Sequence, residues 1–158
     1  MNLFAWIEAT SLAEYVRVSA LGYPMMIALH SLGLAIMVGL SVVLSLRVLG
    51  FFRAIPFTAL QRLLPVAWVG FIVNTLSGSS LFAAQATTYV TDFEFLLKMT
   101  FVVIGAVLVG LMQGAISANI SAGITTASAS SSTLRLFAIG TIIAWTIAMV
   151  AGRLIAYL

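Results

Sequence analysis

Apolar residues fill four long stretches of the chain, and polar or charged residues gather between them. The uncharged stretches cover residues 18–46, 63–91, 99–134 and 136–152. Each holds the ~20 apolar residues that a bilayer-spanning helix needs, and none shows the period-two alternation of membrane β-strands. The pattern predicts an all-α integral membrane four-helix bundle, a single transmembrane domain over residues 1–158 with helices at about 18–46, 64–87, 94–118 and 134–157.

Residues 1–16 precede the first predicted span and suit a position on the membrane surface, with the Trp6 indole among lipid head groups. The apolar positions of this interfacial segment are Leu3, Phe4, Trp6 and Ile7. It lacks the basic start and the cleavage site of a signal peptide, so we expect it to be retained. Capping-box patterns at residues 11–14 and 91–94 predict the starts of the first and third spans.

The charges between the spans predict an orientation. The first connection carries Arg47, Arg53 and Arg62 and no acid, which places it in the cytoplasm by the positive-inside tendency. The second connection carries Asp92 and Glu94, as expected for the opposite side. Both termini then face outward, which in a bacterial inner (cytoplasmic) membrane means the periplasm.

The composition narrows the chemistry. Hydrophobic residues make up 63% of the chain and charged residues 7%, and the mean hydropathy is +1.20, as expected for a membrane protein. The absence of cysteine excludes disulfides, iron–sulfur clusters and thiolate chemistry. A single histidine cannot form a zinc or copper site alone. The net charge of +3 is scattered, so we expect no nucleic-acid partner.

Small or polar residues recur at helical spacing in every predicted span. The rows are Ser31, Ala35 and Gly39; Gly70, Asn74 and Gly78; Ala106, Gly110, Gly114 and Ala118; and Gly140, Ala144, Ala148, Gly152 and Ala156. Such rows let helix backbones approach closely in lipid, where no hydrophobic force drives association. They predict one compact bundle, and they could equally serve contacts with another subunit or a second copy of the chain.

The one histidine, His30, lies within the uncharged stretch PMMIALHSLGLAIMVG, residues 24–39. It lies roughly 20 Å of helix beyond Arg17 at ~1.5 Å per residue, near the middle of the bilayer or slightly to the outer side. Lys98 and Arg153 lie toward the same outer surface. Haem b would fit, with its iron on the His30 imidazole and its propionates on the two cations. Met149, one turn inward of Arg153, is the best-placed second iron ligand.

A second interpretation of these residues needs no cofactor. A buried imidazole can hydrogen-bond a backbone carbonyl or Asn74 across the bundle. Lys98 and Arg153 can each reach lipid head groups from a helix end. Membrane haems generally use two histidines, whereas this chain offers one, so the second ligand would be a methionine, a residue of another subunit, or absent in a five-coordinate iron.

Other polar residues within the spans are expected to form hydrogen bonds between helices. They are Asn74, Thr75, Ser77, Ser79, Ser80 and Gln113. The cluster at residues 74–80 could instead line a polar path or a pocket for a quinone head group. All four acids of the chain lie outside the apolar cores, which argues against a proton-driven transporter.

Several short motifs resemble a family of small bacterial four-helix membrane proteins known only as a domain of unknown function. The motifs are Tyr23-Pro24 with ALHSLGLAIMVG, LRVLG at 46–50, LPVAWVGF at 64–71, SGSSLF at 77–82 and FEFLLKM at 93–99. The resemblance covers about residues 23–112, implies the four-helix fold and marks His30, Arg47, Gly78 and Lys98. It implies no established activity. The chain is more loosely similar to membrane b-type cytochromes and copper-resistance membrane domains.

From these observations we expect a membrane subunit of an electron-transfer assembly that binds haem b through His30, with Lys98, Arg153 and Met149 completing the site. The alternative is a cofactor-free structural or assembly subunit of a larger membrane complex. The expected partners are the lipid bilayer and other membrane subunits or further copies of the chain. The sequence predicts no catalytic residue, which favours a non-catalytic or electron-transfer subunit and leaves open whether the chain is an enzyme.

Overall fold

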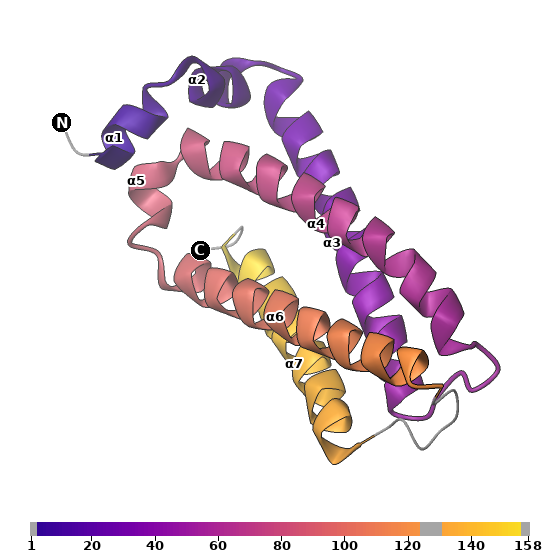
Figure 1. The fold of residues 1–158 in the computed structure, drawn as a ribbon. Helices are drawn as coiled ribbons and strands as arrows, with labels where there is room; N and C mark the ends of the chain where they lie inside the picture. The colour runs from indigo at the N-terminus through magenta and orange to yellow at the C-terminus, as the bar shows by residue number, and fades with distance from the viewer. Residues whose placement is uncertain (1–2, 124–130, 156–158) are drawn as a thin grey trace.

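The computed structural model describes residues 3–123 and 131–155, whose regular elements are all helices (Figure 1). Three helices are short: α1 (Leu3–Glu8), α2 (Ser11–Val18) and α5 (Ala86–Tyr89). Four are long: α3 (Gly22–Val48), α4 (Phe57–Ala84), α6 (Phe93–Ser121) and α7 (Ser132–Leu154). Each long helix has the length and composition to cross a membrane. The predicted all-α fold is confirmed, with four helices of membrane-spanning length packed as a bundle.

Capping residues explain where two helices begin. The short helix α2 begins at Ser11, and its cap is Thr10, whose Oγ1 accepts the N–H of Ala13 at 3.4 Å, not Ser11 as the predicted 11–14 box requires. The first span therefore begins only at Gly22, and not near residue 18. Asp92 caps α6 by accepting the amide N–H two residues later at 3.0 Å. The cap is therefore Asp92 and not Thr91, the first residue of the predicted 91–94 box.

The second span begins before the predicted residue 64 and ends at Ala84, before the predicted residue 87. It starts at Phe57, because Pro56 holds an extended conformation (φ −69°, ψ 145°) that suits the residue before a helix. Residues 57–62, predicted to belong to the first connection, are therefore helical. The predicted end of the fourth span at residue 157, and residues 124–130 of the third connection, lie outside the described residues.

The long helices form two pairs, α3 with α4 and α6 with α7, and α3 also packs along α7 (Figure 1). Helices α4 and α6 touch at few points. We call the half of the bundle next to the connection 49–56 the loop half. The other half, whose end carries α1, α2 and α5, is the capped half.

The hydrophobic core gathers toward the loop half. Most of its buried side chains belong to the second halves of α3 and α6 and the first halves of α4 and α7. The largest are Met37, Leu44, Leu64, Met112 and Trp145. Trp145, which is 1% exposed, lies near the middle of the bundle, where the core ends.

Glycines permit the closest contacts between helices. A Cβ atom on Gly33 would lie 2.6 Å from both the backbone N of Asn74 and the carbonyl O of Gly70, so the backbones of α3 and α4 meet there. A Cβ atom on Gly105 of α6 would lie 3.0 Å from the indole of Trp145 on α7. Because lipid supplies no hydrophobic force between helices, such approaches hold the two pairs together.

The predicted small-residue rows have different surroundings. Those of α4 and α7 face neighbouring helices: Gly70 meets α3, and a Cβ on Gly140 would lie 3.1 Å from Leu108 of α6. The row of α3 does not, because Ser31, Ala35 and Gly39 are exposed and α3 packs through Gly33 and Met37 instead. Gly114 of α6 likewise has open space beside it. Ala156, the last member of the α7 row, lies outside the described residues.

Large apolar side chains cover the outer faces of the long helices. On α4 they are Leu63, Val66, Val69, Ile72 and Leu76, and on α6 they include Val103, Ile104, Val107 and Leu111. Such exposed apolar surface along helices of spanning length fits contact with lipid chains and not with water. The structure therefore supports a multi-pass membrane protein.

Candidate functional site

His30 is fixed by reciprocal hydrogen bonds between α3 and α4. Its Nδ1 atom lies 3.0 Å from the carbonyl O of Asn74, and the Asn74 side-chain Nδ2 donates to the carbonyl O of His30 at 2.8 Å. Because a carbonyl can only accept, Nδ1 carries the hydrogen. In the neutral ring Nε2 is then an acceptor. The cofactor-free interpretation had named these two partners for His30, a backbone carbonyl and Asn74.

Gly78 makes this ring position possible. A Cβ atom at Gly78 would lie 2.9 Å from Cε1 and 3.1 Å from Nδ1 of His30. The imidazole therefore lies flat against α4 where the helix has no side chain. Asn74, buried at 8% exposure, lies one helical turn away on the same face. The ring is thus oriented by α4 although it belongs to α3.

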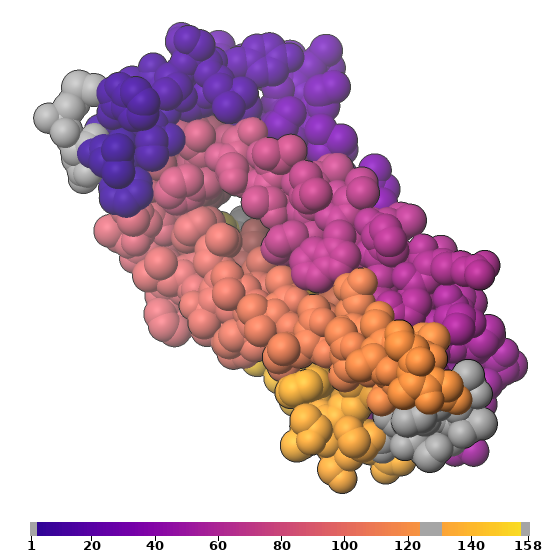
Figure 2. All heavy atoms as spheres, in the orientation of Figure 1, coloured from indigo at the N-terminus to yellow at the C-terminus, as the bar shows by residue number. Residues whose placement is uncertain are grey.

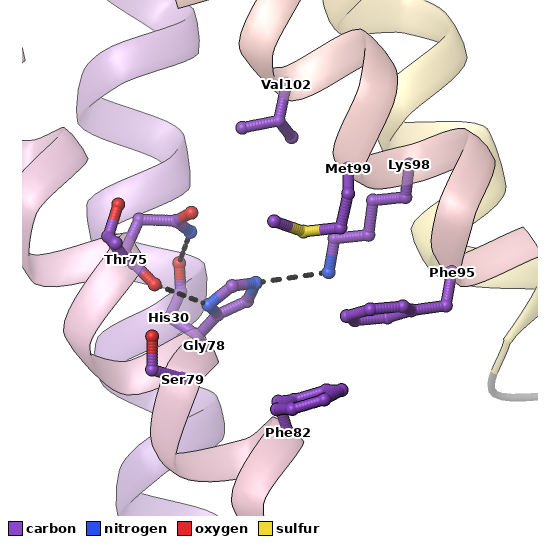
Figure 3. Close-up of a pocket in the computed structure, with 10 residues that line it drawn as sticks. His30, Thr75, Gly78, Ser79, Phe82, Phe95, Lys98, Met99 and Val102 are labelled. Atoms are coloured by element: carbon purple, nitrogen blue, oxygen red, sulfur yellow. Dashed lines mark hydrogen bonds between the residues drawn. The ribbon is translucent and has the colours of Figure 1, made fainter. Parts of the chain in front are cut away.

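Lys98 of α6 extends toward the free nitrogen of His30. Its Nζ lies 3.5 Å from His30 Nε2, so the ammonium donates to the ring across the space between the helix pairs (Figure 3). The methylene stem of Lys98 lies along α7, where a Cβ at Gly152 would be 3.4 Å from its Cδ. His30 and Lys98, expected only to lie toward the same membrane surface, are in direct contact.

A cavity of about 310 Å³ surrounds this contact in the capped half. Its walls are His30 of α3, residues of α4 and residues of α6. The α4 residues are Asn74, Thr75, Gly78, Ser79 and Phe82, and the α6 residues are Phe95, Lys98, Met99 and Val102. The space-filling view shows an opening between α4 and α6 in this half (Figure 2). The outer faces of α4 and α6 on either side of this opening are apolar.

Aromatic rings close the cavity on the side of α5. Phe82 and Phe95 stack with their centroids 5.3 Å apart, and Tyr89 stacks on Phe95 at 5.4 Å. Phe4 of α1 meets Phe82 edge-on at 6.4 Å. Burial raises the pKa of the Tyr89 phenol, and the charges of Tyr23 and Asp92 add to the rise. The N-terminal helices are thereby packed against the wall of the cavity.

Glu8 ties α1 to α5 at the capped end. Its carboxylate accepts the backbone N–H of Thr87 at 2.9 Å and the Thr87 hydroxyl at 2.8 Å. These bonds lower the pKa of the partly exposed Glu8 carboxyl. The contact joins residues 79 positions apart in the sequence and holds the N-terminal segment beside the start of α6.

The other predicted site residues lie outside the cavity walls. Met149 is 39% exposed on α7, and Arg153 is exposed near the end of that helix, beside the glycine on which the Lys98 stem rests. Met99 is instead the methionine on the wall that faces α4. The structure therefore brings together His30 and Lys98 but not Met149 or Arg153.

Sequence reasoning missed the aromatic and aliphatic part of the wall. A signal was present: residues 74, 78 and 82 of α4, and residues 95, 98, 99 and 102 of α6, share a face at spacings of three and four. The contacts of His30 with Asn74 and Lys98 lie on these same faces of α4 and α6. Hydropathy alone cannot show this pattern, because Phe, Met and Val are equally common on lipid-facing surfaces.

The remaining polar residues mostly hold helices together or bond their own backbone. Trp68 Nε1 donates to Gln113 Oε1 at 2.9 Å, and Gln61 Nε2 donates to the Gln113 carbonyl at 3.1 Å, which ties α4 to α6 in the loop half. The hydroxyls of Thr75 and Ser80 instead donate to carbonyls one turn earlier in α4. Interhelical bonding is thus found for Asn74 and Gln113 but not for these two hydroxyls.

Within the described residues, no group of three or more His, Cys, Asp or Glu side chains could hold a metal ion. No family model, no curated protein and no solved structure matches this chain. The resemblance to the uncharacterised four-helix family therefore identifies no family, and the comparisons assign no activity.

Proposed function

We propose that the chain is a membrane subunit of an electron-transfer assembly and that the cavity binds the head group of a quinone. One observation carries the proposal: His30 Nε2 and Lys98 Nζ converge at 3.5 Å in a cavity whose other walls are largely apolar. Ligand sites generally combine an apolar lining with a few convergent polar groups. Ionisable side chains inside a membrane are costly, so their presence together supports a function.

The two nitrogens suit both redox forms of a quinone. A quinone carbonyl can accept a hydrogen bond from Lys98 Nζ, which has three donors. A quinol hydroxyl can donate to His30 Nε2 when the Lys98 ammonium turns from the ring to the ligand. The stacked rings of Phe82 and Phe95 offer a flat apolar surface for the ring of the ligand. The opening between α4 and α6 faces the lipid, in which quinones dissolve, so the tail can remain in the bilayer.

Haem b is the second candidate, and a specific observation favours it. The Nδ1 bond to the Asn74 carbonyl leaves Nε2 free, which is how metal-binding histidines are commonly oriented. Met99 offers a thioether from the facing wall, and Lys98 could pair a propionate. Lys98 Nζ, however, lies where iron on Nε2 would need room. A quinone head group requires no displacement of Lys98.

The test is a binding and content measurement on protein purified in mild detergent. We expect quinone in its lipid extract and saturable binding of a short-chain benzoquinone, followed by quenching of tryptophan fluorescence. His30→Ala, which removes the ring that positions Lys98 Nζ, should weaken this binding by up to about tenfold, as for loss of one hydrogen bond. Arg153→Gln, outside the cavity, is the matched control and should bind normally.

Two other results would replace this proposal. A Soret band that disappears in His30→Ala, without quinone binding, would establish the haem site instead. Protein that binds neither quinone nor haem but co-purifies with a larger complex would be the cofactor-free structural or assembly subunit. In that case His30→Ala should keep the partner and lose only stability.

The proposal includes a sidedness and a partner. The exposed Arg53 and Arg62 at the loop end favour the cytoplasm for that end, with α1, α2 and α5 on the periplasmic side of a bacterial inner membrane. A quinone exchanges electrons with another redox centre, and a chain with one histidine and no cysteine is expected to find that centre on another subunit. Because the chain has no cysteine, single introduced cysteines at residues 17 and 62 can report the sidedness through an impermeant thiol reagent.

A further inference from the structure

Lys98 has no anionic partner in the part of the chain that the structure describes. Its Nζ contacts His30 Nε2 and forms no salt bridge with a described carboxylate. The four acids of the sequence are placed elsewhere: Glu8 binds Thr87, Glu14 is exposed on α2, and Asp92 caps α6. Glu94, one turn before Lys98 on the same helix, does not line the cavity. Among the described residues the ammonium is therefore a half-buried cation without a counter-ion.

The position of this cation is built by two helices. The stem of Lys98 rests on Gly152 of α7, and its end meets a ring nitrogen that α4 orients through the Asn74 carbonyl. One N–H of the ammonium is used by His30, and two remain for a ligand. The end of Lys98 therefore turns into the cavity toward His30.

An unpaired charge in a low-dielectric site is costly unless an opposite charge joins it. A ligand that brings negative charge within hydrogen-bond distance of Nζ gains far more there than in water, since the interaction is weakly screened. A neutral ligand of the same shape gains only an ordinary hydrogen bond. The cavity should therefore distinguish ligands by charge.

We propose that Lys98 makes the site selective for the anionic oxygen form of a quinone, such as a semiquinone or a ring-hydroxylated quinonate, over the neutral quinone. This inference rests on the proposed quinone function and names the form of the ligand that the site binds best. Lys98 is then a specificity-determining residue, and His30 positions its ammonium.

A matched pair of ring compounds tests the inference on the full-length protein in detergent. The pair is 1,4-naphthoquinone, which is neutral, and 2-hydroxy-1,4-naphthoquinone, whose hydroxyl is ionised at neutral pH. The wild type should bind the anion at least about tenfold more tightly. Raising the salt concentration should leave most of this preference in place, because a partly buried pair is screened less than surface charges.

Three variants separate the role of Lys98 from general effects. Lys98→Met keeps the length and apolar stem and should bind both compounds about equally, whereas Lys98→Arg should retain the preference. Arg153→Gln, which removes an exposed cation at the same end of the bundle, should leave the preference unchanged.

The outcomes distinguish the two proposals. If the wild type binds both compounds equally, or if Lys98→Met keeps the preference, selectivity by Lys98 is overturned while the quinone site stands. If the wild type binds neither compound, the quinone function fails and the inference fails with it. If Arg153→Gln abolishes the preference for the anion, then surface charge causes the preference, and the role of Lys98 is overturned.

Discussion

In the loop half of the bundle the four long helices close around buried Met112, Leu64 and Leu44, whereas in the capped half the same helices leave a cavity with two ionisable side chains. The loop half has glutamine and tryptophan bonds between α4 and α6. In the capped half, the described contacts between the pairs include a long lysine–histidine contact and a ring stack. Tight packing at one end accompanies an open cavity at the other, where two ionisable side chains meet between largely apolar walls.

Changing a large aromatic residue in each half gives the largest contrast. Trp145→Ala should lower the free energy of unfolding by about 3–5 kcal/mol, the usual cost for a fully buried tryptophan. Phe95→Ala, at the cavity, should cost about 1 kcal/mol for each lost ring pair. Denaturant unfolding in bicelles measures both. Equal losses would show that the capped half is packed as tightly as the core.

Trp145→Phe is the control for this prediction. The Nε1 atom of Trp145 is buried without a hydrogen-bond partner among the described residues. Phenylalanine removes this unsatisfied donor while it keeps most of the packing, so its cost should be well below that of alanine. A loss as large as that of Trp145→Ala would mean that Nε1 has a partner, such as a buried water.

The second prediction concerns the pairing of α3 with α4, which orients His30. Gly33→Ala places a methyl group 2.6 Å from backbone atoms of α4, so it should cost roughly 1–3 kcal/mol. It should also disturb the Asn74–His30 bonds nearby. Gly39→Ala, on the same helix with nothing within 4 Å, is the matched control and should be neutral. A neutral Gly33→Ala would disprove the close backbone contact.

The sequence predicted the number of spans and their approximate positions because apolar length alone decides which segments can cross a bilayer. It missed the first turns of α4, since Phe57 and Arg62 belong to a helix that begins outside the uncharged stretch. It also assigned the 11–14 cap to the first span, because a cap motif does not indicate how far its helix runs. Helix existence was thus easier to predict than helix ends.

For the site, the sequence identified His30 and Lys98 but not their contact. That contact depends on Gly78 and Gly152, whose missing side chains leave room for the His30 ring and for the Lys98 stem. It also depends on α4 and α6 separating in the capped half, a property of packing that no short motif encodes. Met149 was predicted as an iron ligand from its position along the fourth span. It lies on an exposed side of α7 and does not line the cavity.

A third prediction tests the bonds that hold α4 to α6 in the loop half. Gln113→Leu leaves the Nε1–H of Trp68 without its acceptor. It should lower the free energy of unfolding by about 0.6–2 kcal/mol, as for interhelical hydrogen bonds in membranes. Combining it with Trp68→Phe in a double-mutant cycle should show a coupling of about that size. Strictly additive losses would contradict a direct bond between the two side chains.

The smallest effect is expected at the end of the capped half, where Glu8 holds Thr87. Because the pKa of Glu8 is lower when folded, this contact contributes above the usual titration range of a glutamate and is lost as the pH falls through the folded pKa. Exchange of the Thr87 amide hydrogen, corrected for its intrinsic pH dependence, should therefore accelerate at acid pH. Glu8→Gln should remove this acid response, and Glu14→Gln on α2 should keep it. Unchanged protection of the Thr87 amide in Glu8→Gln would mean that the ring contacts of Phe4 alone hold α1 in place.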